Sequence, residues 1–429
     1  MSAPYFPRWN LRTDGGVVAP DERLPAGQTV ALGVQHVVAM FGATVLAPLL
    51  MGFDPNVAIL FSGIGTLIFF VAVGGRVPSY LGSSFSFIAV VIAATSYSGS
   101  GPNANIAVAL GGIVAAGIAY AIVGLVVMKV GYAWIETLMP PVVTGAVVAV
   151  IGLNLAPIAV KGISGSAFDT WIGLATVVAV GLVAVRAPGV LRRLPILAGA
   201  IAGYALYALL ANGLGLGKPI DFAPVAAAAW IGAPRFTTPQ WSWPAIALIA
   251  PVAIVLVAEN LGHVKAVAAM TGENLDRYLG RAFLGDGIAT VVAGAGGGTG
   301  VTTYAENIGV MAVTKIYSTL LFVVAALAAI ALGFSPKFGA LIATIPGPVL
   351  GGLAIVVFGL ITATGARIWI VNNVDFGRAR NLVTAAATLT IGAGDLAVRI
   401  AGFTLGGIGT ATFGAIVLYQ LWRDGPDPR

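Results

Sequence analysis

Four ionisable side chains lie inside or beside long apolar stretches of the sequence: Glu259, His263, Asp286 and Glu306. An ionisable group at bilayer depth costs at least about 2.5–3.5 kcal/mol, which favours a functional role over simple packing. Glu259 and His263 are four residues apart in AENLGH and therefore share one face of a helix. Glu306 opens a short helical run, where unpaired backbone N–H groups favour its negative charge. These residues predict a transport site with proton coupling, because imidazole titrates near neutral pH.

Other chemistry fits these residues less well. A catalytic metal site usually needs three protein ligands, whereas the chain has two histidines, His36 and His263, and no cysteine. The pair Glu259 and His263 does not form the HExxH motif of a zinc protease, and no GxSxG nucleophile motif is present. We therefore predict no metal, no cofactor and no enzyme. A structural role, in which Glu259 and His263 pair and brace a helix bundle, stays open.

The same residues indicate what such a site would bind. Carboxylates accept hydrogen bonds, and backbone N–H groups at helix starts donate them. The ring of Phe85 or Tyr304 has the shape to stack on a flat molecule. Two carboxylates repel an anion. The chemical complement is therefore a neutral planar heterocycle with alternating N–H and C=O groups.

Composition identifies the setting of this site. Of 429 residues, 58% are hydrophobic and 9% are charged, against about 25% charged in soluble domains. A soluble enzyme is excluded, and an integral membrane protein of spanning helices in a lipid bilayer is expected. The net charge of +6 is scattered, so no nucleic-acid-binding patch is predicted. The Gly-rich run 294–300 lacks a following GK[ST], which argues against ATP binding.

Apolar windows predict fourteen membrane segments. Residues 1–27 have no apolar core and are expected to form a cytosolic tail rather than a signal peptide. Segments 79–97 and 299–314 are apolar only in part. The other twelve lie near 28–50, 56–74, 105–130, 139–160, 168–187, 193–213, 244–268, 278–295, 316–335, 346–365, 380–394 and 405–422.

The basic residues predict the orientation of these segments. With the N-terminus inside, Lys265 lies within a segment and the outer side holds five basic residues: Lys161, Lys218, Arg235, Lys337 and Arg399. The positive-inside rule therefore favours two cytosolic termini in the cell's inner (cytoplasmic) membrane. The inner side holds sixteen: Arg8, Arg12, Arg23, Arg76, Lys129, Arg186, Arg192, Arg193, Arg277, Arg281, Lys315, Arg367, Arg378, Arg380, Arg423 and Arg429.

The two partly polar segments indicate an internal repeat. Each reads as a short strand followed by a half-helix, and broken segments in matching positions point to a transporter binding site. His36 precedes Ser83 by 47 residues (83 − 36), and Glu259 precedes Glu306 by 47 (306 − 259). Seven segments per half make the second copy inverted. The predicted fold is an all-α membrane protein of two inverted repeats of seven, with segments 3 and 10 broken.

One motif carries a family resemblance. Residues 306–315 (ENIGVMAVTK) match the signature [Gln/Glu/Pro]-Asn-x-Gly-x-x-x-x-Thr-[Arg/Lys/Gly] of the nucleobase–cation symporters, also called nucleobase–ascorbate transporters. Gln35-His36, the run from Tyr80 to Phe85, and Ala258-Glu259-Asn260 with His263 are similar to other conserved motifs of that family. The likeness covers nearly the whole chain after the tail.

The resemblance implies an architecture and a site. It implies a core domain (28–131 and 244–335), a gate domain (132–243 and 336–429) and homodimers formed through the gate. Positions matching Glu259 and Glu306 bind the base. Phe85, Tyr304 and Ala305 line the site in this comparison, and His263 serves proton coupling. Further support is implied for Asn307, Gln35, His36, Ser84 and Asp286.

Substrate choice within the family rests on a few positions. Glu306 at the first signature position resembles the uracil branch, whereas Asp286 resembles purine carriers, and Ala305 replaces a family glycine. We expect proton-coupled uracil import by rocking of core against gate, with His263 hydrogen-bonded to Glu259. A purine permease of the xanthine or urate type is the main alternative. An anion exchanger or channel of the same fold is weaker, since such a site would favour a basic residue where Glu306 stands.

Overall fold

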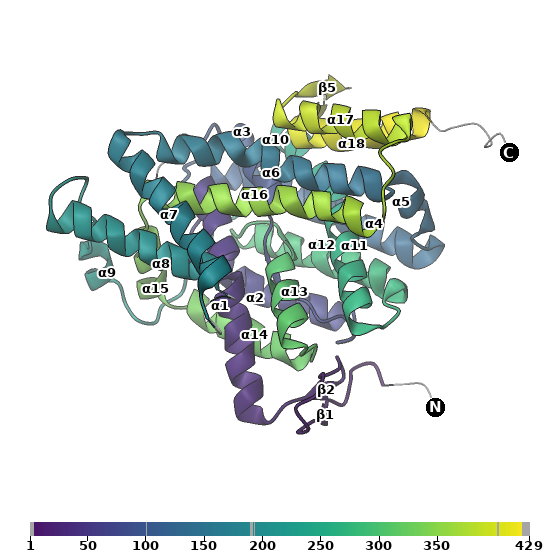
Figure 1. Cartoon of the computed structure of the whole chain (residues 1–429), viewed down its shortest axis with the longest axis horizontal. Coiled ribbons are helices and arrows are strands. Elements are labelled where there is room, and N and C mark those ends of the chain that lie inside the picture. The colour runs from purple at the N-terminus through teal and green to yellow at the C-terminus, as the bar shows by residue number, and fades with distance from the viewer. Residues whose placement is uncertain (1–3, 100, 189–191, 193, 401–402, 423–429) are drawn as a thin grey trace.

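The computed structural model describes residues 4–99, 101–188, 192, 194–400 and 403–422 (Figure 1). Within these ranges eight helices are long and apolar enough to cross a membrane, or nine if the bent pair α14 and α15 counts as one span. The chain is therefore a largely helical, multi-pass membrane protein. Arg193, Arg423 and Arg429, three of the residues used above to predict orientation, lie outside the described residues.

A helix or a helix pair lies at each of the twelve apolar segments. Proline at the first or second helical position starts several of them, since its fixed φ suits a helix start and its missing N–H is not needed there. The helices are α1 (Ala26–Met51), α2 (Pro55–Ala72), α4 (Ile106–Val130), α6 (Pro141–Ile163), α7 (Ala167–Arg186), α8 (Pro195–Ala208), α10 (Trp243–Ile249), α11 (Val252–Thr271), α12 (Leu279–Ala295), α14 (Leu320–Gly333), α16 (Gly347–Val371), α17 (Ala379–Ala393) and α18 (Gly407–Leu421).

The two partly polar segments form strands that continue into short helices, as predicted. Strand β3 (Leu81–Ser83) leads through a 3₁₀ turn, η1 (Phe85–Phe87), into α3 (Ile88–Thr95). Strand β4 (Val301–Thr303) leads into α13 (Ala305–Thr314). The strands pair antiparallel, with Gly82 opposite Thr302. Backbone N–H and C=O groups outside a helix find no hydrogen-bond partner in lipid. The pairing of the two strands provides these partners.

Shorter elements connect the long helices. The prediction of an all-α chain omitted the strands outside the two broken segments. The shorter connecting elements, strands and helices together, are β1 (Asn10–Leu11), β2 (Glu22–Arg23), α5 (Ala133–Leu138), the π-helical turn η3 (Leu209–Gly213), α9 (Ala223–Ala227), the 3₁₀ turn η4 (Asp276–Tyr278), α15 (Pro336–Ala343), β5 (Val398–Ile400) and β6 (Phe403–Leu405).

Glycines set the closest helix contacts. Helix α4 packs against α12, and α6 packs against α16. A Cβ atom added to Gly117 of α4 would lie 2.8 Å from the backbone nitrogen of Val291, and one added to Gly365 of α16 would lie 2.6 Å from that of Ala149. Small residues allow this backbone approach inside a membrane, where packing rather than the hydrophobic effect drives helix association.

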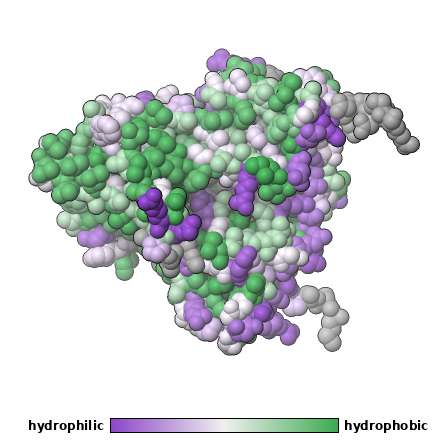
Figure 2. Space-filling view, in the orientation of Figure 1, coloured by the Kyte–Doolittle hydropathy of each residue, from purple (hydrophilic) through white to green (hydrophobic). Residues whose placement is uncertain are grey.

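Helices α7 and α8 form a lobe that is mostly exposed. Only 22% of the apolar window of each is buried within the chain. Exposed side chains include Trp171, Val178 and Leu182 on α7 and Ile201 on α8. Figure 2 shows this lobe, at the left of the view, as largely apolar. Such a surface suits contact with lipid rather than water.

The predicted tail is folded against the helices from Pro4 to Arg23. We call this segment the N-terminal strap. The hydroxyl of Tyr5 donates to the carbonyl of Val71 (2.7 Å), and Trp9 Nε1 donates to Thr319 Oγ1 (2.9 Å). The amide of Tyr317 donates to the carbonyl of Val18 (2.8 Å). The strap therefore joins the end of α2 to the connection between α13 and α14.

The strap should lose order in acid through Glu22. The backbone N–H of Ala19 donates to Glu22 Oε2 (2.8 Å) and, against partial burial, this bond and the Arg12 guanidinium lower the pKa of Glu22. A lowered folded-state pKa stabilises the strap above the ordinary value of 4.5, and that stabilisation is lost as pH falls through the lowered pKa. Amide hydrogen-exchange protection of residues 9–23, corrected for intrinsic rates, should fall severalfold between about pH 5 and about pH 3.

Glu22→Gln should weaken protection at neutral pH and flatten its dependence on pH. Asp21→Asn, an exposed neighbour, is the matched control and should retain the wild-type profile. An unchanged profile in Glu22→Gln would assign the acid sensitivity to another group.

Candidate functional site

The paired strands place two helix starts side by side. Beyond β3 the amide of Ser84 donates to the carbonyl of Gly300 (2.9 Å), and beyond β4 the amide of Tyr304 donates to that of Tyr80 (3.0 Å). The chain then enters η1 at Phe85 and α13 at Ala305. The first N–H groups of a helix have no acceptor within it. Donors from both starts are thus available beside the strand pair.

Two carboxylates lie at this point. Glu306 is in the first turn of α13, and Glu259 comes from α11. The hydroxyl of Ser86, in η1, lies 3.5 Å from Glu259 Oε2 and is placed to donate to it. Helices α11 and α13, which carry these two carboxylates, pack against each other. The structure therefore brings together the acidic residues predicted for the site, with the start of η1 beside them.

His263 has a different partner from the one expected. Its Nδ1 lies 2.9 Å from Thr303 Oγ1 on β4, and no hydrogen bond joins it to Glu259 among the described residues. The predicted bond between His263 and Glu259 is therefore corrected. Their spacing does put both on one helix face, but the imidazole bonds to the strand. Because the Thr303 hydroxyl also lies 3.3 Å from Asn260 Oδ1 as a donor, its remaining role toward His263 is as acceptor.

Asp286 is on α12 and is fully buried. Its Oδ2 accepts from Asn260 Nδ2 (2.7 Å) and from the Tyr120 hydroxyl (3.4 Å). Its Oδ1 has no partner within the described part of the chain. A continuous series of hydrogen bonds therefore runs from His263 through Thr303 and Asn260 to Asp286.

On the other side of α13, Asn307 fastens the half-helix to α1. Its Nδ2 lies 3.0 Å from His36 Nδ1 and 3.1 Å from the His36 carbonyl oxygen. Both side chains are buried, and the His36 ring packs on Phe322. In the described residues Gln35 Nε2 and Asn307 Oδ1 are buried without a partner. His36 thus braces α13, while Gln35 keeps an unused donor.

The aromatic residues have separate positions. The Tyr304 hydroxyl donates to the Ser83 carbonyl (2.8 Å) and accepts from Thr44 (3.2 Å), so its buried ring packs against β3. Phe85 instead meets Phe358 of α16 edge to face, with 5.8 Å between ring centroids. Ser84 is buried, and its hydroxyl accepts from the amide of Ser86 at the start of η1. Tyr304 therefore supports β3, whereas Phe85 lies in contact with α16.

A cavity of about 730 Å³ adjoins Glu306. Glu306, Gly309 and Val313 line it from α13, and Leu360 of α16 and Arg192, just before α8, line it opposite. Ala305 is exposed at the start of α13. Sequence reasoning missed Ser86, Thr303 and Arg192. Only Ser86 had a signal, since it lies in the Ser-rich run before the half-helix. No group of three or more His, Asp or Glu among the described residues is arranged to hold a metal ion.

Comparison with known proteins identifies the family. The sequence pattern described as "Permease family" matches residues 27–401. The chain belongs to this family. It is the group of nucleobase transporters that residues 306–315 resemble. The chain is 64% identical over 419 residues to a protein of Escherichia coli (strain K12) named as a pyrimidine permease, RutG, covering 97% of this chain and 95% of that one.

A second relative is more distant. The uracil permease of Paenibacillus larvae subsp. larvae is 41% identical over 418 residues, covering 94% of this chain and 96% of the relative. These relatives are permeases, so the chain is a transporter and not an enzyme. The transmembrane domain of a cyanobacterial bicarbonate transporter, BicA, has the same fold. It matches with a TM-score of 0.60 at 17% identity, over 91% of this chain and 96% of that one.

Closing the space under β3 should disrupt the site. A Cβ atom on Gly82 would lie 2.5 Å from Tyr304 Cζ and 2.6 Å from Thr44 Oγ1. Gly82→Ala should therefore destabilise the protein by about 1–3 kcal/mol, as overpacking does, and should lower its thermal unfolding midpoint in detergent. Gly359→Ala, on α16 with nothing within 4 Å, is the control and should be neutral or slightly stabilising. Equal midpoints for the two variants would contradict this account of Tyr304.

Proposed function

We propose that the protein imports uracil across the cell's inner membrane together with a proton. The observation that carries this proposal is the position of Glu306 in the first turn of α13, which packs on α11, while Glu259 of α11 accepts from Ser86 at the start of η1. This arrangement combines two hydrogen-bond acceptors with backbone donors. Names of relatives support the substrate class, since one is named for pyrimidines and another for uracil.

The chemistry of uracil suits this arrangement. Its two ring N–H groups would donate to the carboxylates of Glu259 and Glu306, and its two carbonyls would accept from backbone N–H groups at Phe85 and Ala305. Phe85 would contact the face of the ring. The ligand is neutral, so it adds no charge repulsion to that between the carboxylates.

The architecture in this proposal has fourteen crossings in two inverted repeats of seven. The packing supports it: β3 pairs with β4, α2 packs on α14 as α4 packs on α12, and α6 packs on α16. The β3–β4 and α6–α16 contacts join matching segments of the two halves, and the α2–α14 contact is the counterpart of the α4–α12 contact. The proposed core is 28–131 with 244–335, and the proposed gate is 132–243 with 336–429. Residues 1–27 would lie in the cytosol, as would the C-terminus.

Transport in this scheme is movement of the core against the gate. The cavity beside Glu306 lies between α1 and α13 of the core and α7, α8 and α16 of the gate. Phe85 and Phe358 touch across the same boundary. Relative motion there would open the site to one side at a time. A homodimer formed through the gate would hold the gate still while the core moves.

Proton coupling in this scheme uses the hydrogen-bonded series behind Glu259. His263 would take up the coupling proton, and its hydrogen bond to Thr303, continued through Asn260 to Asp286, would hold the imidazole in place. Glu259 lies between this series and the ligand. Binding of uracil would thereby affect the groups that hold the proton.

Glu306→Gln should lower uptake of labelled uracil into proteoliposomes by roughly 10- to 100-fold. The amide keeps the size of the side chain but removes the charge and one acceptor, and hydrogen bonds to a charged group contribute about 1.5–3 kcal/mol, or roughly 10- to 100-fold. Glu259→Gln should behave alike. Glu273→Gln, an exposed carboxylate outside the long helices, is the matched control and should transport normally. Normal uptake by Glu306→Gln would remove this residue from the site.

Competition in the same assay separates the substrates. Excess unlabelled uracil should suppress uptake more strongly than excess xanthine. Stronger suppression by xanthine would favour a purine permease. Saturable bicarbonate or chloride flux without uracil uptake would instead favour an anion exchanger.

The dependence of uptake on an imposed pH gradient tests His263. In His263→Gln, uracil should equilibrate across the membrane but should not accumulate, since Gln cannot take up a proton. Thr303→Val, which removes the hydrogen-bond partner but keeps the side-chain shape, should weaken accumulation less. Full accumulation by His263→Gln would indicate that a carboxylate such as Glu259 or Asp286, and not His263, binds the coupling proton.

A further inference from the structure

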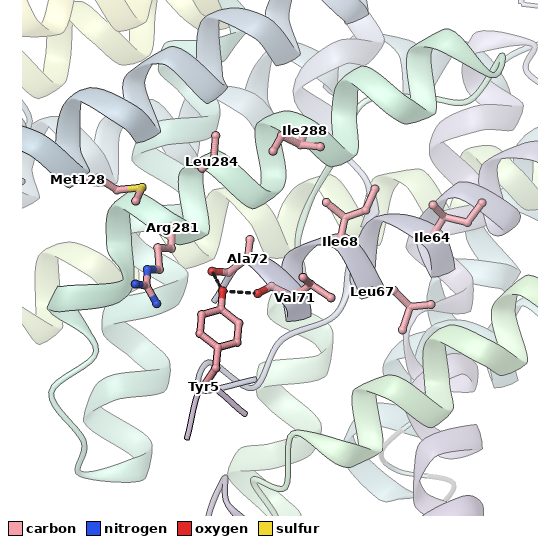
Figure 3. Close-up of a pocket in the computed structure, with 10 residues that line it drawn as sticks. All are labelled: Tyr5, Ile64, Leu67, Ile68, Val71, Ala72, Met128, Arg281, Leu284 and Ile288. Atoms are coloured by element: carbon pink, nitrogen blue, oxygen red, sulfur yellow. Dashed lines mark hydrogen bonds between the residues drawn. The ribbon is translucent and has the colours of Figure 1, made fainter. Parts of the chain in front are cut away.

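A second cavity lies on the surface of the helix bundle, away from the candidate site. It has a volume of about 660 Å³ and runs between α2 and α12, with the end of α4 beside it. Its walls are apolar side chains, among them Ile68 of α2 and Leu284 and Ile288 of α12. Figure 3 shows Leu284 and Ile288 on one helix and Ile64 and Ile68 on the other, with Tyr5 and Arg281 toward one end. We call it the α2–α12 groove.

One end of the groove has a cationic side chain without an ion-pair partner among the described residues. Arg281 lies in the first turn of α12, with its guanidinium carbon 5.7 Å from the centroid of the Tyr5 ring. No carboxylate forms an ion pair with it among the described residues. The acids near Arg281 in sequence are engaged elsewhere. Asp286 accepts hydrogen bonds from Asn260 and Tyr120, Asp276 pairs with Lys265, and the charge of Glu273 interacts with Arg277 and Arg76.

The surroundings strengthen the positive character of this end. Lys129 follows Met128, which lines the groove, in the last turn of α4, and its side chain is exposed. Arg277, one turn before Arg281, is also exposed, although its charge interacts with that of Glu273. The N-terminus of α12 adds the positive end of a helix dipole. An anion at this point would meet several cations, and an apolar chain attached to it would meet an apolar wall.

We propose that the α2–α12 groove binds an anionic phospholipid, with its phosphate on Arg281 and an acyl chain along Ile68 and Ile288. The cations at the end of the groove select an anionic head group by charge complementarity. The apolar side chains of the groove would face the acyl chains that surround membrane-spanning helices. The N-terminal strap completes the site. Its Tyr5 ring is held at the end of the groove by bonds from its hydroxyl to the carbonyls of Val71 and Ala72.

Lipid binding can be measured by native mass spectrometry on the purified, delipidated full-length chain. Phosphatidylglycerol and phosphatidylcholine with the same acyl chains are titrated separately. The wild type should bind phosphatidylglycerol about fivefold more tightly, as expected for one basic residue at a membrane surface. Arg281→Gln should lose most of this preference. Arg367→Gln, an exposed arginine on α16 outside the groove, should retain the preference.

Further variants separate the head group from the chain. Ile288→Trp places a larger side chain in the groove and should weaken binding of both lipids. The thermal unfolding midpoint of this variant shows whether the variant is folded. Inorganic phosphate at millimolar concentration should not displace phosphatidylglycerol. Equal binding of the two lipids by the wild type, an unchanged preference in Arg281→Gln, an equal loss in Arg367→Gln, or full displacement by phosphate would each overturn the proposal.

Discussion

The structure depends on satisfying backbone hydrogen bonds where a helix is interrupted inside a membrane. A continuous helix satisfies these groups within itself, whereas an extended segment needs a partner. Here β3 and β4 provide that partner for each other, although they are more than 200 residues apart in sequence. Their ladder extends by one bond beyond each strand, to Ser84 and Tyr304. Without this pairing neither helix start would have a defined position.

The side chains around the strands serve this pairing. Tyr304 fills the space that Gly82 leaves open and bonds to Ser83, and Asn307 ties the start of α13 to His36 on α1. Glycine contacts between α4 and α12 and between α6 and α16 hold the surrounding helices at close range. The ligand-facing groups are thus supported by neighbours that do not face the ligand. Rigid support of this kind is what an accurate binding site requires.

Much of this arrangement was predictable, because membrane segments carry strong local signals. Twelve apolar windows became helices, and the polar runs before Phe85 and Ala305 became strands leading into half-helices. The sequence did not reveal the partner of His263, because helical spacing defines a shared face but not a side-chain torsion. It also did not reveal the N-terminal strap, whose short strands have no apolar periodicity and whose Val18 bonds to Lys315 and Tyr317, far along the chain. The family assignment followed from one ten-residue motif, whereas the domain boundaries and the roles of individual site residues remain predictions.

The shortness of α13 has a consequence for the electric field. Ten residues of helix span about 15 Å, roughly half of a hydrocarbon core about 30 Å thick. Where a cavity next to such a half-helix admits water, a membrane potential falls across the remaining thickness instead of the whole. The field is then steepest in the dry part of the protein beyond Glu306. Moving one elementary charge through the full potential is worth about 2.3 kcal/mol per 100 mV, so a charge leaving this point would experience most of that energy over half the usual distance.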